Sequence, residues 1–172
     1  MKVTRSLFLL TAAMSFFIKS NADSLNVGDT APVISGITDT GVTLNLGDVY
    51  RDNTYTVVWF YPRALTGGCT KQGCSLRDGS ADLAKYDATI VGVSTDPVER
   101  QKEFKEKNHF PFPLIADTDK KVMEAFGQSA KPAASRECYV IGRDGKIIYK
   151  DEGVTDKQAD NVLAFLKTQK KQ

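Results

Sequence analysis

The sequence has 172 residues, of which 41% are hydrophobic, and this is enough to fill the core of one compact domain. Its 23 basic and 21 acidic residues give a formal net charge of +2, so the chain has no large field of a single sign. We therefore expect one domain and no nucleic-acid partner.

The first 22 residues differ from the rest of the chain. Two basic residues precede an apolar run over residues 7–18, and small residues at 20–22 stand before a possible cleavage point. This pattern predicts a secretory signal peptide over residues 1–22, followed by a domain over residues 23–172. An uncleaved membrane anchor and an N-terminal helix packed on the domain are the alternatives, but the apolar run is short for a membrane span.

A signal peptide would direct the protein to the bacterial periplasm or outside the cell, with no stable membrane association after cleavage. In such an oxidising compartment, paired cysteines usually become structural disulfides. Cys69, Cys74 and Cys138 all lie in the predicted mature domain. Because their number is odd, one of them is left unpaired or reactive.

Strands and helices alternate along the predicted mature domain. A β-branched and aromatic run over residues 56–61 predicts a buried strand, and residues 89–93 have the same character. Between them, the proline-free residues 71–86 predict a helix, so the three segments form a strand-helix-strand unit with a right-handed crossover. Asp96 then supplies a cap for a charged helix that ends near residue 107.

The C-terminal part completes the predicted fold. A short helix is expected over residues 120–126, followed by a hairpin of residues 138–141 and 146–149. Residues 155–158, Thr-Asp-Lys-Gln, match a capping box before an amphipathic helix. These elements predict an α/β protein with a thioredoxin-like fold, in which helices flank a central mixed β-sheet.

Cys69 follows the first predicted strand and opens the predicted helix. Its sulfur should therefore lie near unpaired backbone amides and the positive end of the helix dipole, which favour the thiolate. Thr66 supplies a hydroxyl nearby, while Gly67 and Gly68 let the backbone approach a small ligand closely. These features predict a nucleophilic cysteine.

The residues around Cys69 also resemble a known family. Residues 60–69, Phe-Tyr-Pro-Arg-Ala-Leu-Thr-Gly-Gly-Cys, are similar to the Pro-x-x-x-Thr-x-x-Cys active-site loop of the peroxiredoxins. The stretch from Gly68 to Cys74, followed by Leu-Arg-Asp at residues 76–78, resembles the Q-type or bacterioferritin-comigratory subfamily. In that subfamily, a resolving cysteine follows the peroxidatic one by five residues.

The resemblance implies a thiol-dependent peroxidase that reduces hydrogen peroxide and organic hydroperoxides. Cys69 would be the peroxidatic residue, and Cys74 would resolve it through an internal disulfide that a thioredoxin-like or other dithiol donor reduces. Thr66 would orient the peroxide, Pro62 would shield the pocket, and Arg136 would lie beside the sulfur. No cofactor or metal is required, and we expect a monomer.

Several alternatives remain open at this level. A structural disulfide between Cys69 and Cys74 would close too small a loop to gain much entropy. A thiol-disulfide oxidoreductase on the same fold typically uses Cys-x-x-Cys, and a peroxide-sensing or chaperone-like protein would oxidise at Cys69 without turnover. A metal site would need more ligands than the single His109 adds. Cys138 fits a buried apolar position, and Arg136 alone would be taken for an exposed charge at a strand end.

Overall fold

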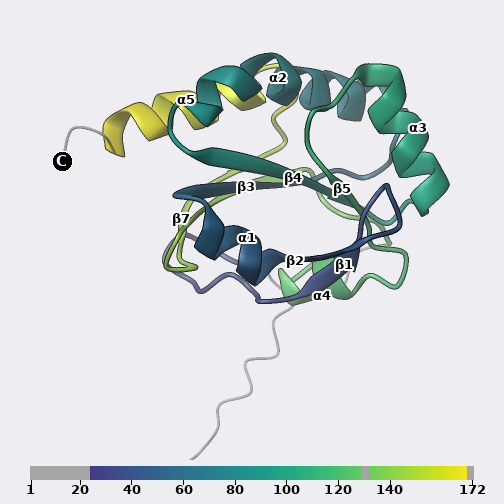
Figure 1. The fold of residues 1–172 in the computed structure, drawn as a ribbon, viewed down its shortest axis with the longest axis horizontal. Coiled ribbons are helices and arrows are strands. Elements are labelled where there is room, and N and C mark those ends of the chain that lie inside the picture. The colour runs from purple at the N-terminus through teal and green to yellow at the C-terminus, as the bar shows by residue number, and fades with distance from the viewer. Residues whose placement is uncertain (1–23, 129–131, 170–172) are drawn as a thin grey trace, which may run out of the picture.

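The computed structural model describes residues 24–128 and 132–169, so the predicted signal peptide over residues 1–22 lies outside the described residues (Figure 1). In the described part of the chain, none of the helices has the length and apolar character of a membrane span. The elements, in chain order, are β1 (Ser35–Ile37), β2 (Thr43–Asn45), α1 (Leu46–Asp52), β3 (Tyr55–Phe60), α2 (Gly67–Ala84), β4 (Ala88–Ser94), α3 (Val98–Asn108), β5 (Leu114–Ala116), α4 (Lys121–Ala125), β6 (Glu137–Gly142), β7 (Ile147–Glu152) and α5 (Gln158–Gln169).

Five strands form the central sheet in the order β5-β4-β3-β6-β7. Strand β3 pairs in parallel with β4 and antiparallel with β6, which places Val58 opposite both Val91 and Tyr139. The outer pairs are parallel for β4 and β5 and antiparallel for β6 and β7, so the sheet is mixed. This arrangement is the predicted thioredoxin-like fold; β1 and β2 form a separate small sheet.

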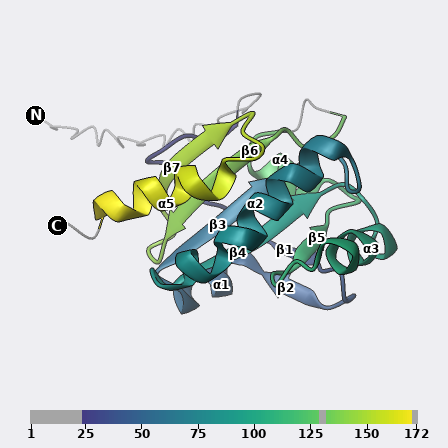
Figure 2. The same ribbon diagram turned by 90° about the horizontal axis from the view of Figure 1, so that it is seen from above.

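Alternate residues of the central strands face two separate cores, because successive side chains of a strand point to opposite faces. Val57 and Trp59 of β3 pack in one core with residues of α2, α3 and α5. Val58 and Phe60 pack in the other core with residues of α1 and α4. Figures 1 and 2 show these helices covering opposite faces of the sheet. The helix that carries Cys69 therefore lies over the first core.

The structure confirms the main predicted elements. The strand-helix-strand unit is β3, α2 and β4, and the hairpin is β6 and β7. The predicted role of Asp96 as a helix cap is wrong. Pro97 precedes α3 as its cap residue, while the Asp96 carboxylate accepts a hydrogen bond from the Ala64 amide in the loop before Cys69.

The predicted capping box before the last helix is also wrong. The Thr155 hydroxyl bonds to Asp156, and the side chain of Gln158 is fully buried and bonded elsewhere. The hydroxyl of Ser75, which belongs to α2, instead accepts a hydrogen bond from the Ala159 amide at 3.0 Å. A tertiary contact between α2 and α5 thus satisfies one of the first amides of α5.

Candidate active site

Cys69 is the third residue of α2, and only 1% of the residue is exposed. Thr66 precedes the helix with extended backbone angles and makes no side-chain bond to the first turn. The first amides of an α-helix have no partners within the helix and carry the positive end of its dipole. The sulfur therefore lies where the backbone stabilises a thiolate.

The loop between β3 and α2 is held in place from the neighbouring strand and helix. The Asp96 carboxylate accepts a hydrogen bond from the Ala64 amide at 2.6 Å, and Arg100 donates to the Ala64 carbonyl at 3.0 Å. The next residue, Leu65, has a φ of 63°, in the left-handed region that side chains rarely adopt. Asp96 and Arg100 thus fix a strained turn directly before the capping residue of α2.

Thr66 and Pro62, both predicted to belong to the site, lie in this loop and are partly buried. The Thr66 hydroxyl donates a hydrogen bond to the carbonyl of Arg63 at 2.8 Å. A hydroxyl that has given its proton to one partner keeps lone pairs for a second. Thr66 can therefore accept a hydrogen bond three residues before the cysteine.

Arg136, the residue directly before β6, approaches Cys69 from 67 residues later in the chain. Its Nη2 lies 3.4 Å from the Cys69 sulfur. The guanidinium also passes close to Gly68, where an added β-carbon would stand 3.0 Å from the same nitrogen. Arginine stays charged at any physiological pH, so it places a permanent positive charge beside the thiolate.

Three residues that sequence reasoning did not assign to the site continue this contact inward. Nη1 of Arg136 donates to Gln72 at 2.7 Å, Gln72 donates to Gln158 at 2.8 Å, and Gln158 donates to both oxygens of Asp151. We call these four residues the polar chain. Gln72 stood inside the family motif and Gln158 inside the predicted capping box, and neither pattern indicated this contact.

Cys74 lies five residues after Cys69 in the same helix, with its sulfur 3.9 Å from Oδ1 of Asn108. All three cysteines are free. In a regular helix, Cα atoms five residues apart are about 8.6 Å from each other, whereas a disulfide tolerates at most about 7 Å. Helix α2 is unbroken from Gly67 to Ala84, so the two cysteines cannot bond without unwinding it.

Cys138 is fully buried in β6, beside Trp59 of β3 and Asp151 of β7. Burial raises the pKa of its thiol well above the ordinary value, and the negative charge of Asp151 raises it further. This environment favours the neutral thiol, which is the less reactive form of cysteine. This environment agrees with the prediction of a small buried apolar residue.

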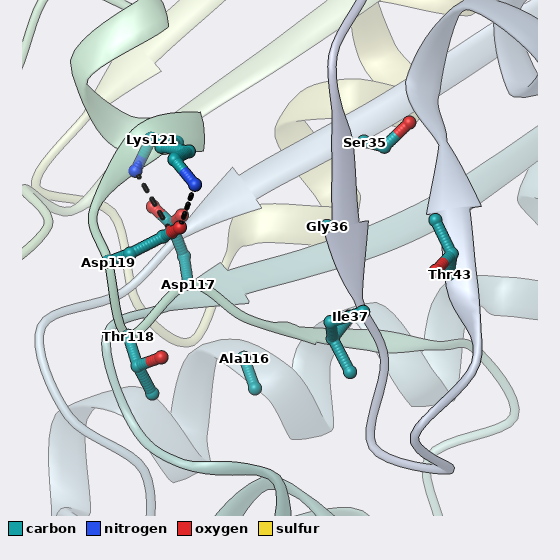
Figure 3. A pocket seen from close by; sticks show the side chains of 9 residues that line it. All are labelled: Ser35, Gly36, Ile37, Thr43, Ala116, Asp117, Thr118, Asp119 and Lys121. Carbon is teal, nitrogen blue, oxygen red and sulfur yellow. Dashed lines mark hydrogen bonds and ion pairs between the residues drawn. The ribbon is translucent and has the colours of Figure 1, made fainter.

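A cavity of about 270 Å³ lies away from these residues, between β1 and the start of α4 (Figure 3). Its lining includes Asp117, Asp119 and Lys121 but no predicted site residue. The Asp117 carboxylate accepts hydrogen bonds from backbone amides in the first turn of α4, and Asp119 forms an ion pair with Lys121. These charged groups therefore already have partners. In the described ranges, no group of three or more His, Cys, Asp or Glu side chains could hold a metal ion.

Comparisons with known proteins find a matching family and relatives that cover most of the chain. Residues 27–150 match the AhpC/TSA family. The peroxiredoxin Bcp of Bacillus subtilis strain 168 is 34% identical over 155 residues, covering 86% of this chain and 96% of that protein. The peroxiredoxin Bcp of Escherichia coli strain K12 is 36% identical over 152 residues, covering 83% and 96%.

Solved structures agree with these sequence matches. The crystal structure of peroxidoxin BcpB from Mycobacterium tuberculosis superposes with a TM-score of 0.76 at 33% identity and covers 83% of this chain and 96% of that one. The bacterioferritin comigratory protein of Xanthomonas campestris, studied for alkyl peroxide reduction, gives a TM-score of 0.73 at 26% identity, covering 86% and 99%.

Proposed function

The chain belongs to the AhpC/TSA family of peroxiredoxins, and from this membership we propose that Cys69 attacks the hydroperoxide and Cys74 regenerates it. The protein is a thiol-dependent peroxidase. Each turnover converts one hydroperoxide and two thiols into an alcohol or water, a second water and a disulfide.

The observation that carries the assignment is the position of the Arg136 guanidinium, 3.4 Å from the buried sulfur of Cys69. Thiolate is the nucleophilic form of cysteine, and burial alone would favour the neutral thiol. A fixed cation and the amino end of α2 together oppose that effect. Cys138 is buried beside Asp151 and not beside a guanidinium, and burial raises the pKa of its thiol.

The first step breaks the O–O bond. The Cys69 thiolate attacks the terminal oxygen, an S–O bond forms, and the other oxygen leaves and takes up a proton to give water or an alcohol. Thr66 accepts a hydrogen bond from the hydroperoxide O–H, and Arg136 stabilises the negative charge on the leaving oxygen. Pro62 shields the loop side of the pocket.

The second step joins the two cysteines. The Cys74 sulfur attacks the sulfenic acid of Cys69, the S–O bond breaks and water leaves, so an internal disulfide remains. Because both cysteines belong to one helix, its first turns must unwind for this bond to form. A thioredoxin-like or other dithiol donor then reduces the exposed disulfide by thiol exchange.

Single-cysteine variants test the scheme when peroxide loss and thiol loss are followed together. The wild-type chain should turn over with one peroxide consumed per two thiols, and Cys69→Ser should abolish this turnover. Cys74→Ser should react once and then stall as a sulfenic acid that a specific reagent traps. Retained turnover in Cys69→Ser, or no trapped sulfenic acid in Cys74→Ser, would overturn the assignment.

We also propose that the protein is exported and that cleavage follows Ala22. The hydroxyl of Ser24 accepts a hydrogen bond from Lys150 at 3.0 Å, and cleavage after Ala22 leaves that contact intact. Intact-mass measurement of protein from an exporting host should give a chain that begins at Asp23. An unprocessed chain in the cytosol would contradict the proposal.

We further propose that the protein acts as a monomer, because Cys69 and its proposed resolving residue Cys74 belong to one helix, so the proposed cycle needs no second copy of the chain. Sedimentation of the reduced protein should give the mass of one chain, and a stable dimer would contradict this part of the proposal.

A further inference from the structure

The polar chain connects the active site through α2 to the start of α5 and to β7, and its two middle side chains are buried. Its distances are 2.7 Å from Arg136 to Gln72, 2.8 Å from Gln72 to Gln158, and 2.9 and 3.0 Å from Gln158 to the oxygens of Asp151. Both glutamines are fully buried. A buried amide must find protein partners, because water does not reach it.

The two ends of the polar chain decide how both amides are oriented. The Asp151 carboxylate can only accept hydrogen bonds and the Arg136 guanidinium can only donate them. Gln158 must therefore turn its NH₂ group to Asp151 and its oxygen to Gln72, which in turn presents its oxygen to Arg136. If either amide were reversed, two donors or two acceptors would face each other.

Asp151 is itself held by further donors. The Tyr149 hydroxyl donates to it at 3.0 Å, and the side chain of Asn161 donates at 3.4 Å. The carboxylate is thus a fixed end for the polar chain. At the other end, the guanidinium of Arg136 makes its hydrogen bonds within the described residues to Gln72 and to Cys69.

We propose that Gln158 and Asp151 are positioning residues, which act through Gln72 to hold the guanidinium of Arg136 against the Cys69 sulfur. This inference rests on the function proposed above for Cys69. It assigns a catalytic consequence to a residue at the start of α5 and a residue in β7, neither of which touches the sulfur. A purely structural role would be to join α5 to α2, and that role predicts a change in stability alone.

The charge of Asp151 allows the positioning role to be separated from a direct electrostatic effect on Cys69. A direct effect of its negative charge would disfavour the Cys69 thiolate, so neutralising it by Asp151→Asn would speed the attack on peroxide. The positioning role predicts the opposite sign. An asparagine can both donate and accept, so it no longer fixes the orientation of Gln158, and attack becomes slower.

The test measures Cys69 oxidation by hydrogen peroxide in a single turnover of the mature chain, with Cys74→Ser as the background so that no disulfide forms. Gln158→Met keeps the length of the side chain and removes its hydrogen bonds. We expect it to slow oxidation about tenfold at neutral pH, which is the lower end of the loss found when a hydrogen-bond partner behind a metal ligand is removed, and to shift the pH profile of the rate to higher pH. Asp151→Asn should slow oxidation by a smaller factor.

The matched control is Val162→Ala, which removes buried apolar contacts from the same helix without touching the polar chain. It should lower the urea midpoint and leave the oxidation rate and its pH profile as in the background protein. If Val162→Ala slowed oxidation as much as Gln158→Met, the effect would be one of helix stability and the proposal would be wrong.

A double variant separates positioning from other effects. If Gln158 acts through Arg136, then adding Gln158→Met to Arg136→Met should leave the rate of Arg136→Met unchanged.

A wild-type rate in Gln158→Met, or a faster rate in Asp151→Asn, would overturn the positioning role and leave the assignment of Cys69 standing. Failure of the background protein to oxidise at Cys69 would instead remove the proposed function itself. Asp151→Asn leaves the side-chain volume nearly unchanged, so this variant tests the positioning role if Gln158→Met does not fold.

Discussion

Gly73 in α2 lies directly against the ring of Phe110, so that a β-carbon on residue 73 would stand 2.4 Å from the ring carbon Cζ. The ring has little room to move, because it stacks on Phe112 at 5.3 Å and meets Phe104 edge-on at 5.0 Å. A glycine is therefore required one residue before Cys74. The same glycine makes unwinding of this turn easier by about 1 kcal/mol than an alanine would.

Gly73→Ala should lower the free energy of unfolding of the reduced protein. In an open helix this substitution gains about 1 kcal/mol, but crowding of a packed core costs about 1–3 kcal/mol, and the close ring makes the second effect larger. Urea unfolding under reducing conditions measures the balance. Adding Phe110→Leu should recover part of the loss, and a Gly73→Ala protein more stable than wild type would show that the ring can give way.

The protein should lose stability steeply at alkaline pH. Burial raises the pKa of the Cys138 thiol above 9.0 and the pKa of the Tyr50, Tyr61 and Tyr139 hydroxyls above 10.0, their ordinary values. Above about pH 9 the unfolded chain therefore binds fewer protons than the folded one, and stability falls as pH rises, by up to about 1.4 kcal/mol per pH unit for each group.

Urea unfolding at a series of pH values measures this loss. Cys138→Ala should flatten the slope between about pH 9 and pH 10, where the thiol is the first of these groups to lose its proton in the unfolded chain. The variant should also keep its peroxidase turnover, because Cys138 does not reach the active site. A slope unchanged by Cys138→Ala would mean that this thiol is not held protonated by the fold.

The central fold could be predicted because its strands carry strong local signals. Strand β3 has a run of β-branched and aromatic residues that are buried on both faces, and β4 repeats it, so the unit around Cys69 was identified from pattern alone. Strands β1, β2 and β5 have three residues each, which is too short for a periodic signal. They were not predicted.

The site was predictable only in part, for a physical reason. Cys69 stands at a strand-to-helix junction, which is a local feature, and Thr66 and Pro62 are its near neighbours in the chain. The contact of Arg136 with the sulfur depends on the pairing of β3 with β6, so only the family resemblance indicated it. Gln158 was assigned to a local capping box because its sequence context carries no sign of a buried partner in α2.

Substitutions at two neighbouring glycines at the start of α2 should affect different properties, stability at Gly67 and the oxidation rate at Gly68. Gly67 is the first helical residue, its β-carbon would meet nothing within 4 Å, and Thr66 has the extended backbone that proline requires of the residue before it. Gly67→Pro should therefore raise the free energy of unfolding by about 0.5–1 kcal/mol by restricting the unfolded chain. It should leave the rate of Cys69 oxidation unchanged.

Gly68→Ala is the contrasting variant. Its β-carbon would stand 3.0 Å from Nη2 of Arg136, the nitrogen that contacts the Cys69 sulfur. We expect this displacement to slow the oxidation of Cys69 by hydrogen peroxide severalfold, with little change in the urea midpoint. Stopped-flow rates for both variants decide the matter, and equal rates for Gly68→Ala and wild type would show that the guanidinium moves aside at no cost to the reaction.

Disulfide formation should loosen α5 as well as α2. Unwinding of the first turns of α2 withdraws Gln72 from Gln158 and Ser75 from the Ala159 amide, and these two contacts hold the first turn of α5. On oxidation, amide hydrogen exchange should therefore become faster over residues 70–78 and at Ala159, while residues 57–60 of β3 stay protected. The control is Cys74→Ser treated with one equivalent of peroxide, which carries a sulfenic acid but no disulfide and should keep Ala159 protected. If Ala159 stayed protected in the disulfide form while residues 70–78 did not, the first turn of α5 would be held by apolar contacts alone. If Ala159 and residues 70–78 all stayed protected, the cysteines would have bonded without unwinding α2.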